Sequence, residues 1–331
     1  MSPHDLPALT QRLRQQAGLR DKQDIQAPAA TFPHQPFPAL GQAAALGDDA
    51  ALLPAAAGPL LLACEGIHPQ LVNEDPWFAG WSGVLVNLSD IAAMGGTPLA
   101  VVNSLWSSGA EHAHQLLAGM RSASETFAIP VVGGHTNLHS PYNALSVAVL
   151  GTVRGPVLSA RAAVAGDACF LLMNVRGRFH RHYPFWDAAT HAEPGPLRDH
   201  LALLADLACA GTVHAAKDIS MGGLVGTAVM FAEAAGCTLE LDLEAIQPPA
   251  GVELESWLTC FPSYGYLLAV DPSRREALRE ATAPHGDLLC ARIGTFAAGE
   301  GELLLRQGDV RCSVWESREQ LTGFGPLHPG S

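Results

Sequence analysis

Residues 87–98 read Asn-Leu-Ser-Asp-Ile-Ala-Ala-Met-Gly-Gly-Thr-Pro, and they are the most informative stretch of the 331-residue chain. Apolar residues at helical spacing predict a helix from about 77 to 94: Trp81, Val84, Leu85, Leu88 and Ile91. Asn87 and Asp90 are three residues apart and therefore share one face of this helix. A solvated polar face is the plainer interpretation of that pair. The glycines at 95 and 96 end the helix in a turn, which lets backbone approach a ligand closely.

Outward from this helix, short apolar runs alternate with helical patterns. In the first half we expect strands at 50–53, 60–64, 99–105, 129–132 and 144–153, and a second helix at 110–127. After a turn-rich stretch, we expect strands at 168–175, 237–243, 264–270 and 288–296, helices at 197–210 and 224–235, and an edge hairpin at 302–306 and 310–315. The pattern predicts an α/β (α+β) protein of two domains.

The length also favours two domains. We predict a helix and an extended arm over residues 1–46, with order beginning near Gly47, and a first domain over 47–160. A second domain follows over 161–321, and residues 322–331 form a surface tail.

Composition excludes several classes of function. Lys and Arg number 19 against 32 Asp and Glu, so the net charge of −13 disfavours nucleic acid and anionic membranes as partners. The chain has no apolar run of membrane-spanning length and no signal peptide, which indicates a cytoplasmic protein. Seven cysteines are spread singly and are interpreted as reduced, buried thiols. The only lysines are Lys22 and Lys217.

Three further segments could carry chemistry. Asp48 and Asp49 precede an apolar strand and could bind a metal ion, although paired acids in a turn are usually solvated. Gly133-Gly134-His135-Thr136 follows another strand, where backbone can approach a ligand, although a lone histidine there is more often structural. Residues 217–224, Lys-Asp-Ile-Ser-Met-Gly-Gly-Leu, open a helix whose N-terminus could cradle phosphate or could simply be capped. The chain has neither a Walker A loop nor a dinucleotide fingerprint.

In order, these segments, together with Glu65-Gly66-Ile67-His68, resemble the superfamily of aminoimidazole ribonucleotide (AIR) synthetase. The superfamily includes thiamine-monophosphate kinase, selenophosphate synthetase and a carbamoyl dehydratase, and the resemblance spans roughly residues 47 to 297. It implies an N-terminal α/β domain whose sheet pairs in a homodimer, and a C-terminal α/β sandwich. It also implies ATP and Mg²⁺ as cofactors and phosphoryl transfer to, or activation of, a small molecule.

The resemblance assigns roles residue by residue. Asp48, Asp49, Glu65 and Asp90 match the positions that hold metal ions. The nucleotide would be bound by Asn87, Asp90, Gly133, Gly134, His135 and Thr136, with catalytic roles for Asp48, Asp90 and His135. His68, Lys217, Asp218 and Ser220 are the candidates for the second substrate, together with the loop from Phe179 to Trp186. Because imidazole is a poor Mg²⁺ ligand, His135 would contact phosphate or orient a neighbour.

Departures from the named members leave the reaction open. Glu65 stands where relatives usually have Asp, and Met221 stands where the kinase has a second Asp. No cysteine precedes Cys64, which disfavours a selenophosphate synthetase activity. The chain is similar to stand-alone members that bacteria encode beside nitrilase-type genes. We therefore expect a Mg²⁺- and ATP-dependent kinase or ligase. The alternatives are a catalytically altered dimer that binds ATP or senses a metabolite, and a structural partner in an assembly.

Overall fold

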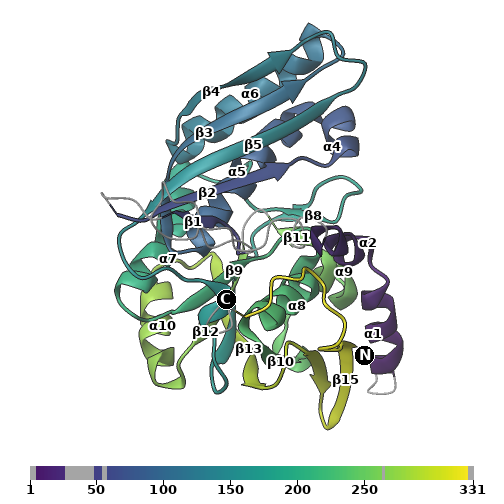
Figure 1. The fold of residues 1–331 in the computed structure, drawn as a ribbon, viewed down its shortest axis with the longest axis vertical. Helices are drawn as coiled ribbons and strands as arrows, with labels where there is room; N and C mark the ends of the chain where they lie inside the picture. Colours follow the sequence, from purple (N-terminus) through teal and green to yellow (C-terminus); the bar gives the residue numbers. More distant parts are fainter. Residues whose placement is uncertain (1–4, 27–47, 54–57, 263–264, 327–331) are drawn as a thin grey trace.

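The computed structural model describes residues 5–26, 48–53, 58–262 and 265–326. The first sheet has five strands in the order β1 (Ala51–Leu53), β2 (Leu60–Gly66), β5 (Ala144–Val153), β3 (Gly96–Trp106) and β4 (Val131–Asn137). Neighbouring strands are antiparallel except β3 and β4. Helix α5 (Pro76–Ala93) packs on one face, with α4 (Pro69–Glu74) and α6 (Ala110–Phe127) beside it (Figure 1).

The opposite face of this sheet is open in the described chain. Leu62 of β2 lies opposite Leu150 of β5, and Val102 lies on β3 two residues beyond Ala100, the partner of Leu150. The exposed fractions of Leu62, Leu150 and Val102 are 45%, 37% and 43%. Their chain neighbours Leu61, Val101 and Val149 point to the helices and are buried, as strand alternation requires. The first sheet therefore has one packed and one uncovered apolar face.

Helix α5 is buried on almost every side. The Asp75 carboxylate caps its first turn by accepting from the Phe78 N–H at 3.3 Å, and Gly95, at φ 72°, ends it in the left-handed region. The helix crosses α6 where Gly80 and Gly119 face the other helix's backbone. A Cβ on Gly119 would lie 1.9 Å from the Trp77 carbonyl oxygen, so only glycine permits this approach. The crossing holds the polar end of α5 in a fixed place.

Seven strands form the second sheet. Their order is β15 (Val310–Trp315), β14 (Leu303–Gln307), β10 (Cys237–Asp242), β13 (Leu288–Ala298), β6 (Ala168–Asn174), β12 (Gly265–Val270) and β9 (Ala215–Asp218). Helices α8 (Gly223–Ala235) and α9 (Leu254–Thr259) pack on one face, and α7 (Pro194–Cys209) and α10 (Arg275–Thr282) on the other. All residues of β6 and β12 are buried, which explains their unbroken apolar sequences.

One hydrophobic core joins the two halves of the molecule. Helix α7 contacts both α5 and α6 on one side and lies against the second sheet on the other. Leu201, Leu204 and Leu207 of α7 therefore share a cluster with Trp81 and Leu88 of α5. A three-stranded sheet, β11 (Phe261–Pro262), β8 (Phe185–Asp187) and β7 (Arg178–Phe179), lies at the same junction.

The N-terminal segment corrects one expectation. In place of one helix and an unordered arm up to Gly47, the structure has α1 (Leu6–Arg14), α2 (Ala17–Arg20) and a 3-10 helix, η2 (Asp21–Ile25). Leu6, Leu9, Leu13 and Leu19 are buried in the second core, which holds α1 against β15 and α2 against α8. The rest of the expected arm, residues 27–47, lies outside the described chain.

Other expectations concern the surface. Thr322, the first residue of the expected tail, is buried, and its N–H and hydroxyl donate to Glu233 at 2.9 Å. All seven cysteines are free, but Cys64 and Cys209 are exposed rather than buried. No helix among the described residues is long and apolar enough to cross a membrane.

Candidate functional site

An acidic pocket lies where the first sheet meets the second. We use this name for the hollow lined by Lys22, Asp48, Asp49, Glu65, Asp90, Lys217, Asp218, Ser220, Met230, Ala234, Thr322 and Phe324. Its polar side chains come from six parts of the chain: η2, the segment before β1, the end of β2, the end of α5, β9 with the loop after it, and the segment after β15 (Val310–Trp315). Seven predicted metal-binding or substrate residues therefore meet in space, namely Asp48, Asp49, Glu65, Asp90, Lys217, Asp218 and Ser220.

Asp49 and Lys217 form a buried ion pair on one wall of the acidic pocket. Their side chains are 4% and 9% exposed, and the backbone N–H of Asp218 also donates to Asp49, at 3.3 Å. Burial alone would lower the pKa of Lys217, but the carboxylates of Asp49, Asp48 and Asp218 raise it above its usual value. Lys217 is therefore held as a cation inside the pocket.

Asp48 is fixed by a different set of contacts. Its Oδ2 accepts from the Ser159 hydroxyl at 2.5 Å and from the Ala160 N–H at 3.0 Å. These bonds tie the segment before β1 to the connection between the two sheets. They place Asp48 and Asp49 at the pocket with a defined orientation.

Asp90 is the most unusual group of the site. Its residue surface is 6% exposed, and its Oδ2 has no hydrogen-bond partner among the described residues. Burial, together with the charges of Asp218 and Glu65, raises the pKa of Asp90 well above its usual value. The Ser220 hydroxyl is likewise buried without a partner among these residues. Buried polar atoms are usually paired, so at the wall of the pocket both groups are available to a ligand.

The donor set of the acidic pocket suits a hard cation. Carboxylate and hydroxyl oxygens are the ligands that Mg²⁺ prefers, and four carboxylates besides Asp48 line the hollow. Within the described residues, no three His, Cys, Asp or Glu side chains converge closely enough to hold one metal ion between them. A cation bound here would therefore draw Asp90 and its neighbours inward or open the Asp49–Lys217 pair.

Several predicted residues lie elsewhere. Asn87 is fully buried on α5, where its Nδ2 donates to the Gly83 carbonyl at 2.8 Å, and it does not line the acidic pocket. The run 133–136 does not follow a strand but continues β4 to Asn137 at the exposed edge of the first sheet. Two strands separate β4 from β2, so His135 and Glu65 are about 14 Å apart across the sheet. His135 instead has its ring 5.8 Å from Trp106.

The turn at Gly95-Gly96 also differs from its expected role. A Cβ on Gly96 would lie 2.5 Å from the Leu61 side chain, and one on Gly95 would lie 3.0 Å from Leu158. These glycines therefore allow close packing of protein against protein, not against a ligand. The turn before α8 is partly covered as well, because Gly18 packs against the Met221 carbonyl.

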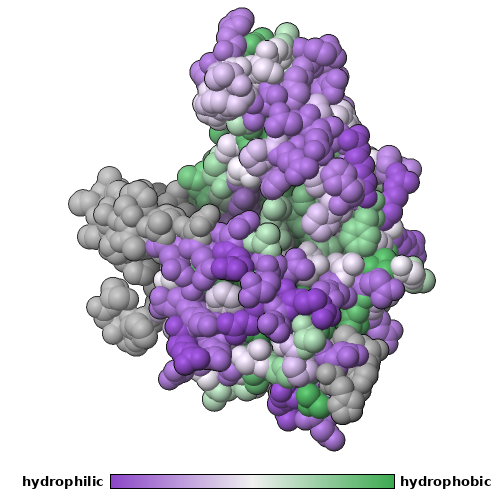
Figure 2. All heavy atoms as spheres, turned by 90° about the vertical axis from the view of Figure 1, so that its right-hand side faces the viewer, coloured by the Kyte–Doolittle hydropathy of each residue, from purple (hydrophilic) through white to green (hydrophobic). Residues whose placement is uncertain are grey.

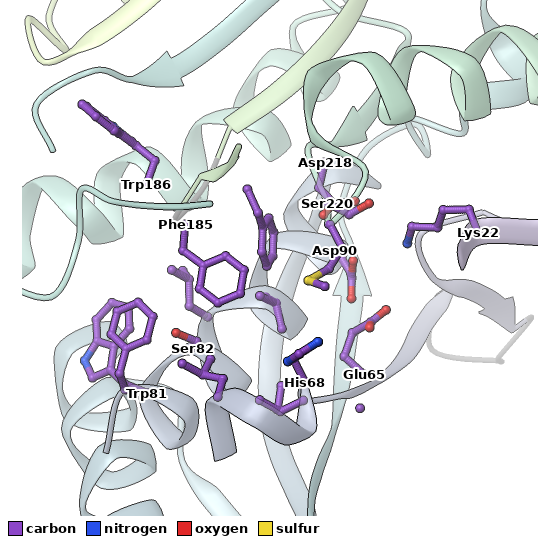
Figure 3. Close-up of a pocket in the computed structure, with 18 residues that line it drawn as sticks. Lys22, Glu65, His68, Trp81, Ser82, Asp90, Phe185, Trp186, Asp218 and Ser220 are labelled. Atoms are coloured by element: carbon purple, nitrogen blue, oxygen red, sulfur yellow. The ribbon is translucent and has the colours of Figure 1, made fainter. Parts of the chain in front are cut away.

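A second hollow, the aromatic pocket, opens directly from the acidic pocket. It shares Lys22, Glu65, Asp90, Asp218 and Ser220 with it and is otherwise lined by Gly66, Ile67, His68, Leu71, Phe78, Trp81, Ser82, Leu85, Val86, Phe185, Trp186, Met221 and Phe261. Figure 3 shows the charged side chains on one side and Trp81, Phe185 and Trp186 on the other. His68 lines this hollow, and its contact with a substrate stays a prediction.

Sequence reasoning missed most of the aromatic pocket and Lys22. The aromatic residues of α5 fit its apolar stripe and carry no separate signal of a binding role. Lys22 is one of only two lysines in the sequence, but no pattern around it indicates a binding role. Both lysines line the acidic pocket, and their scarcity in an acidic chain was the available signal.

The loop from Phe179 to Trp186 divides between two tasks. Phe185 and Trp186 line the aromatic pocket. The residues between turn away to the end of α4, where His180 and Arg181 each contact Asp75 at 2.9 Å. We call this contact, with the bond from the Tyr183 hydroxyl to Glu74, the α4 clasp. It joins the small third sheet to the first half of the molecule.

The structure thus has two α/β halves that meet at a pocket of carboxylates. Residues 47–153 match the model of the AIR synthase related protein N-terminal domain, and residues 180–305 match that of its C-terminal domain. The chain belongs to the AIR synthase related protein family.

Individual relatives range from close to distant. An uncharacterised protein of Synechocystis sp. is 46% identical over 314 residues, covering 94% of this chain and 96% of that one. The solved structure described as AaThiL complexed with AMPPCP and TMP has a TM-score of 0.60 at 20% identity, covering 80% of this chain and 90% of that one. That of Thermotoga maritima PurL complexed with ATP has a TM-score of 0.64 at 17% identity, with 90% and 50% covered. At such identities these likenesses show the fold alone.

Proposed function

We propose that the protein binds ATP with Mg²⁺ in the acidic pocket and phosphorylates or otherwise activates a small molecule held in the adjoining aromatic pocket. The observation that carries this proposal is Asp90, a buried carboxylate without a partner among the described residues, facing other carboxylates and a buried lysine. A cation and a triphosphate would supply the missing partners. The solved relatives with AMPPCP and ATP support the same use of the fold.

The donor set assigns the tasks of this reaction. Asp90, Asp49, Asp48 and Glu65 would hold Mg²⁺, which neutralises the triphosphate when bound. Lys22 and Lys217 add positive charge on the protein side. An oxygen of the acceptor would form a bond to the γ-phosphorus while the bond to the β–γ bridging oxygen breaks and ADP leaves. The proton of the acceptor would pass to solvent water at the exposed mouth of both hollows, where Glu65 lies.

Calorimetric titration tests the first half of this proposal. The non-hydrolysable analogue AMPPCP should bind in the presence of Mg²⁺ and at least tenfold more weakly without it. Glu65→Gln should weaken the binding, and Glu111→Gln, a matched change on the exposed face of α6, should not. Equal affinities in all four measurements would contradict the site.

Release of ADP tests the second half. With ATP and a panel of small amines, amides, carboxylates, alcohols and phosphate esters, at least one acceptor should stimulate ADP formation. Binding of ATP without stimulation by any acceptor would instead favour a nucleotide-binding or metabolite-sensing protein, an alternative suggested by Met221 and by the Lys217 pair on Asp49.

We further propose that two copies pair through the open face of the first sheet. Leu62, Val102 and Leu150 form an apolar surface on three adjacent strands there, and exposed apolar patches of this kind mark interaction surfaces. Gly133, Gly134, His135 and Thr136 lie at the edge of the same sheet, so their predicted contact with a nucleotide depends on this pairing. The similarity to stand-alone members encoded beside nitrilase-type genes stays a prediction.

A further inference from the structure

The aromatic pocket has the lining of a site for a small organic molecule, with mostly apolar and aromatic side chains and a few polar groups at one end. Its cavity volume is about 90 Å³. Its walls come from both halves of the molecule: Phe78 and Trp81 from α5, Phe185 from β8 and Phe261 from β11. Figure 2 shows apolar residues exposed on the surface between the upper and the lower part of the molecule in that view.

The charges of this pocket are unevenly placed. All its carboxylates lie at the end shared with the acidic pocket, and Lys22 is at that same end. None of the chain's 17 arginines lines the pocket among the described residues. Phosphate groups are normally held by arginine, lysine or helix N-termini. Among the described residues, the apolar end therefore offers neither arginine nor lysine to the phosphate of a phosphorylated acceptor.

Met221 completes the apolar surface at the mouth of the pocket. It is 39% exposed and lies on the loop between β9 and α8, directly after Ser220. A methionine thioether packs well against aromatic rings and adapts to their shape. The exposed Met221 side chain lies beside three carboxylates, where burial in the core does not explain an apolar residue. It extends the apolar wall towards the end that is shared with the acidic pocket.

The α4 clasp fixes the wall that faces α5. The His180 ring stacks on Phe78 with centroids 3.7 Å apart, and its Nε2 lies 2.9 Å from Asp75. The Tyr183 ring stacks on Phe185 with centroids 5.1 Å apart. Phe185 is thereby held against the pocket by a continuous set of ring and ionic contacts, so the aromatic walls are formed before any ligand binds.

We propose that the aromatic pocket selects an unphosphorylated acceptor: a small molecule with an aromatic or largely apolar body and one oxygen-bearing polar group that reaches Glu65 and Asp90. This inference rests on the proposed function for the transfer step but not for binding. Met221 and Phe185 contact the apolar body, and the described residues at that end provide no arginine that would favour an acceptor with a phosphate there.

Binding of defined probes tests the proposal without turnover. Ligand-observed NMR compares the binding of phenylacetamide, benzyl alcohol and indole-3-acetate with that of thiamine monophosphate and ribose 5-phosphate. The measurement should cover dissociation constants up to about 1 mM, the weak binding expected of molecules this small. The variants are Met221→Asp, which places a charge at the mouth, and Met221→Leu as its matched control. AMPPCP binding to each variant is measured separately, so that a loss of nucleotide binding can be distinguished from a loss of probe binding.

We expect at least one unphosphorylated aromatic probe to bind, with affinity reduced fivefold or more by Met221→Asp and changed less than twofold by Met221→Leu. AMPPCP binding should survive both changes. The proposal is overturned if the phosphorylated probes bind and the aromatic ones do not, if no aromatic probe binds, or if Met221→Asp leaves aromatic binding unchanged. If AMPPCP does not bind to the wild-type protein, that result would instead count against the proposed function.

Discussion

Replacing Asp90 by Asn should separate a ligand-binding carboxylate from a structural one. The two side chains have nearly the same shape, so the packing of α5 is kept. Without nucleotide, the change removes a buried negative charge that Asp218 and Glu65 repel and whose Oδ2 has no partner among the described residues. The amide of Asn cannot ionise and therefore avoids this repulsion, so the ligand-free variant should be more stable by about 1–2 kcal/mol. The melting temperature should rise by about 2–4 °C.

With nucleotide bound, the order of the two melting temperatures should reverse. At a concentration of Mg²⁺–AMPPCP a hundred times the dissociation constant, the wild type gains about 2.7 kcal/mol from binding. If loss of the carboxylate weakens binding about a hundredfold, the same concentration stabilises the variant by only RT ln 2, about 0.4 kcal/mol. The variant then melts above the wild type without ligand and below it with ligand.

Differential scanning calorimetry with and without Mg²⁺–AMPPCP measures both effects. Asp206→Asn on the exposed side of α7 is the control, since that carboxylate is 68% exposed and far from the pocket. If Asp90→Asn lowers the melting temperature of the ligand-free protein and leaves the shift on adding nucleotide unchanged, Asp90 is a structural residue and the reasoning is refuted.

Four other substitutions test separate parts of the structure. Gly119→Ala puts a Cβ against the Trp77 carbonyl and should destabilise the fold by about 3 kcal/mol in urea unfolding, whereas Gly195→Ala, in open space on α7, should cost nothing; equal stabilities would contradict the crossing. Leu150→Lys should convert a dimer to a monomer in analytical ultracentrifugation, and Val164→Lys, at an apolar residue that is more exposed and lies outside this sheet, should not. Lys22→Gln should weaken AMPPCP binding about tenfold, with Arg20→Gln in the same segment as its control; no change would remove Lys22 from the site. The hydrogen bond from Tyr183 holds the pKa of Glu74 below its usual 4.5, so its contribution to stability is complete above that value and is lost as pH falls through the lowered one. The melting temperatures of wild type and Tyr183→Phe should therefore differ at pH 7 and converge towards pH 3; a constant difference would show that the bond plays no part.

The regular elements with strong periodicity could be predicted from the sequence. The helices expected at 77–94 and 110–127 are confirmed as α5 and α6, and the strand at 144–153 as β5. The hairpin at the edge of the second sheet is confirmed as β14 and β15. Local periodicity decides these elements because each buries its own apolar face.

Elements whose form depends on distant partners were missed. Strand β9 has only four residues and includes Lys217 and Asp218, so its sequence resembles a polar turn. It is a strand because it pairs with β12, which no local pattern reveals. The glycines of β4 were expected after the strand for the same reason, since the pairing of β4 with β3 extends it to Asn137.

The candidate site was predictable in its residue types and not in its grouping. Asp48, Asp49, Glu65, Asp90 and Asp218 were found from ordered acidic segments, and the fold brings them to one hollow. The aromatic pocket could not be found in this way, because Trp81 and Phe185 are 104 positions apart in the numbering and resemble ordinary core residues. Whether Asn87 and the run 133–136 act on the nucleotide stays a prediction.

The core that α7 shares with α5 and α6 makes the two halves of the molecule one folding unit. Cutting the chain near residue 160 would leave Trp81, Leu88 and their neighbours on one fragment without the leucines of α7 that cover them. Neither fragment would be expected to stay folded and monomeric in isolation. The packing between the two halves must therefore be kept in any chimaera. If one half is exchanged for that of a relative, α7 has to be taken from the same protein as the helices that it contacts, α5 and α6.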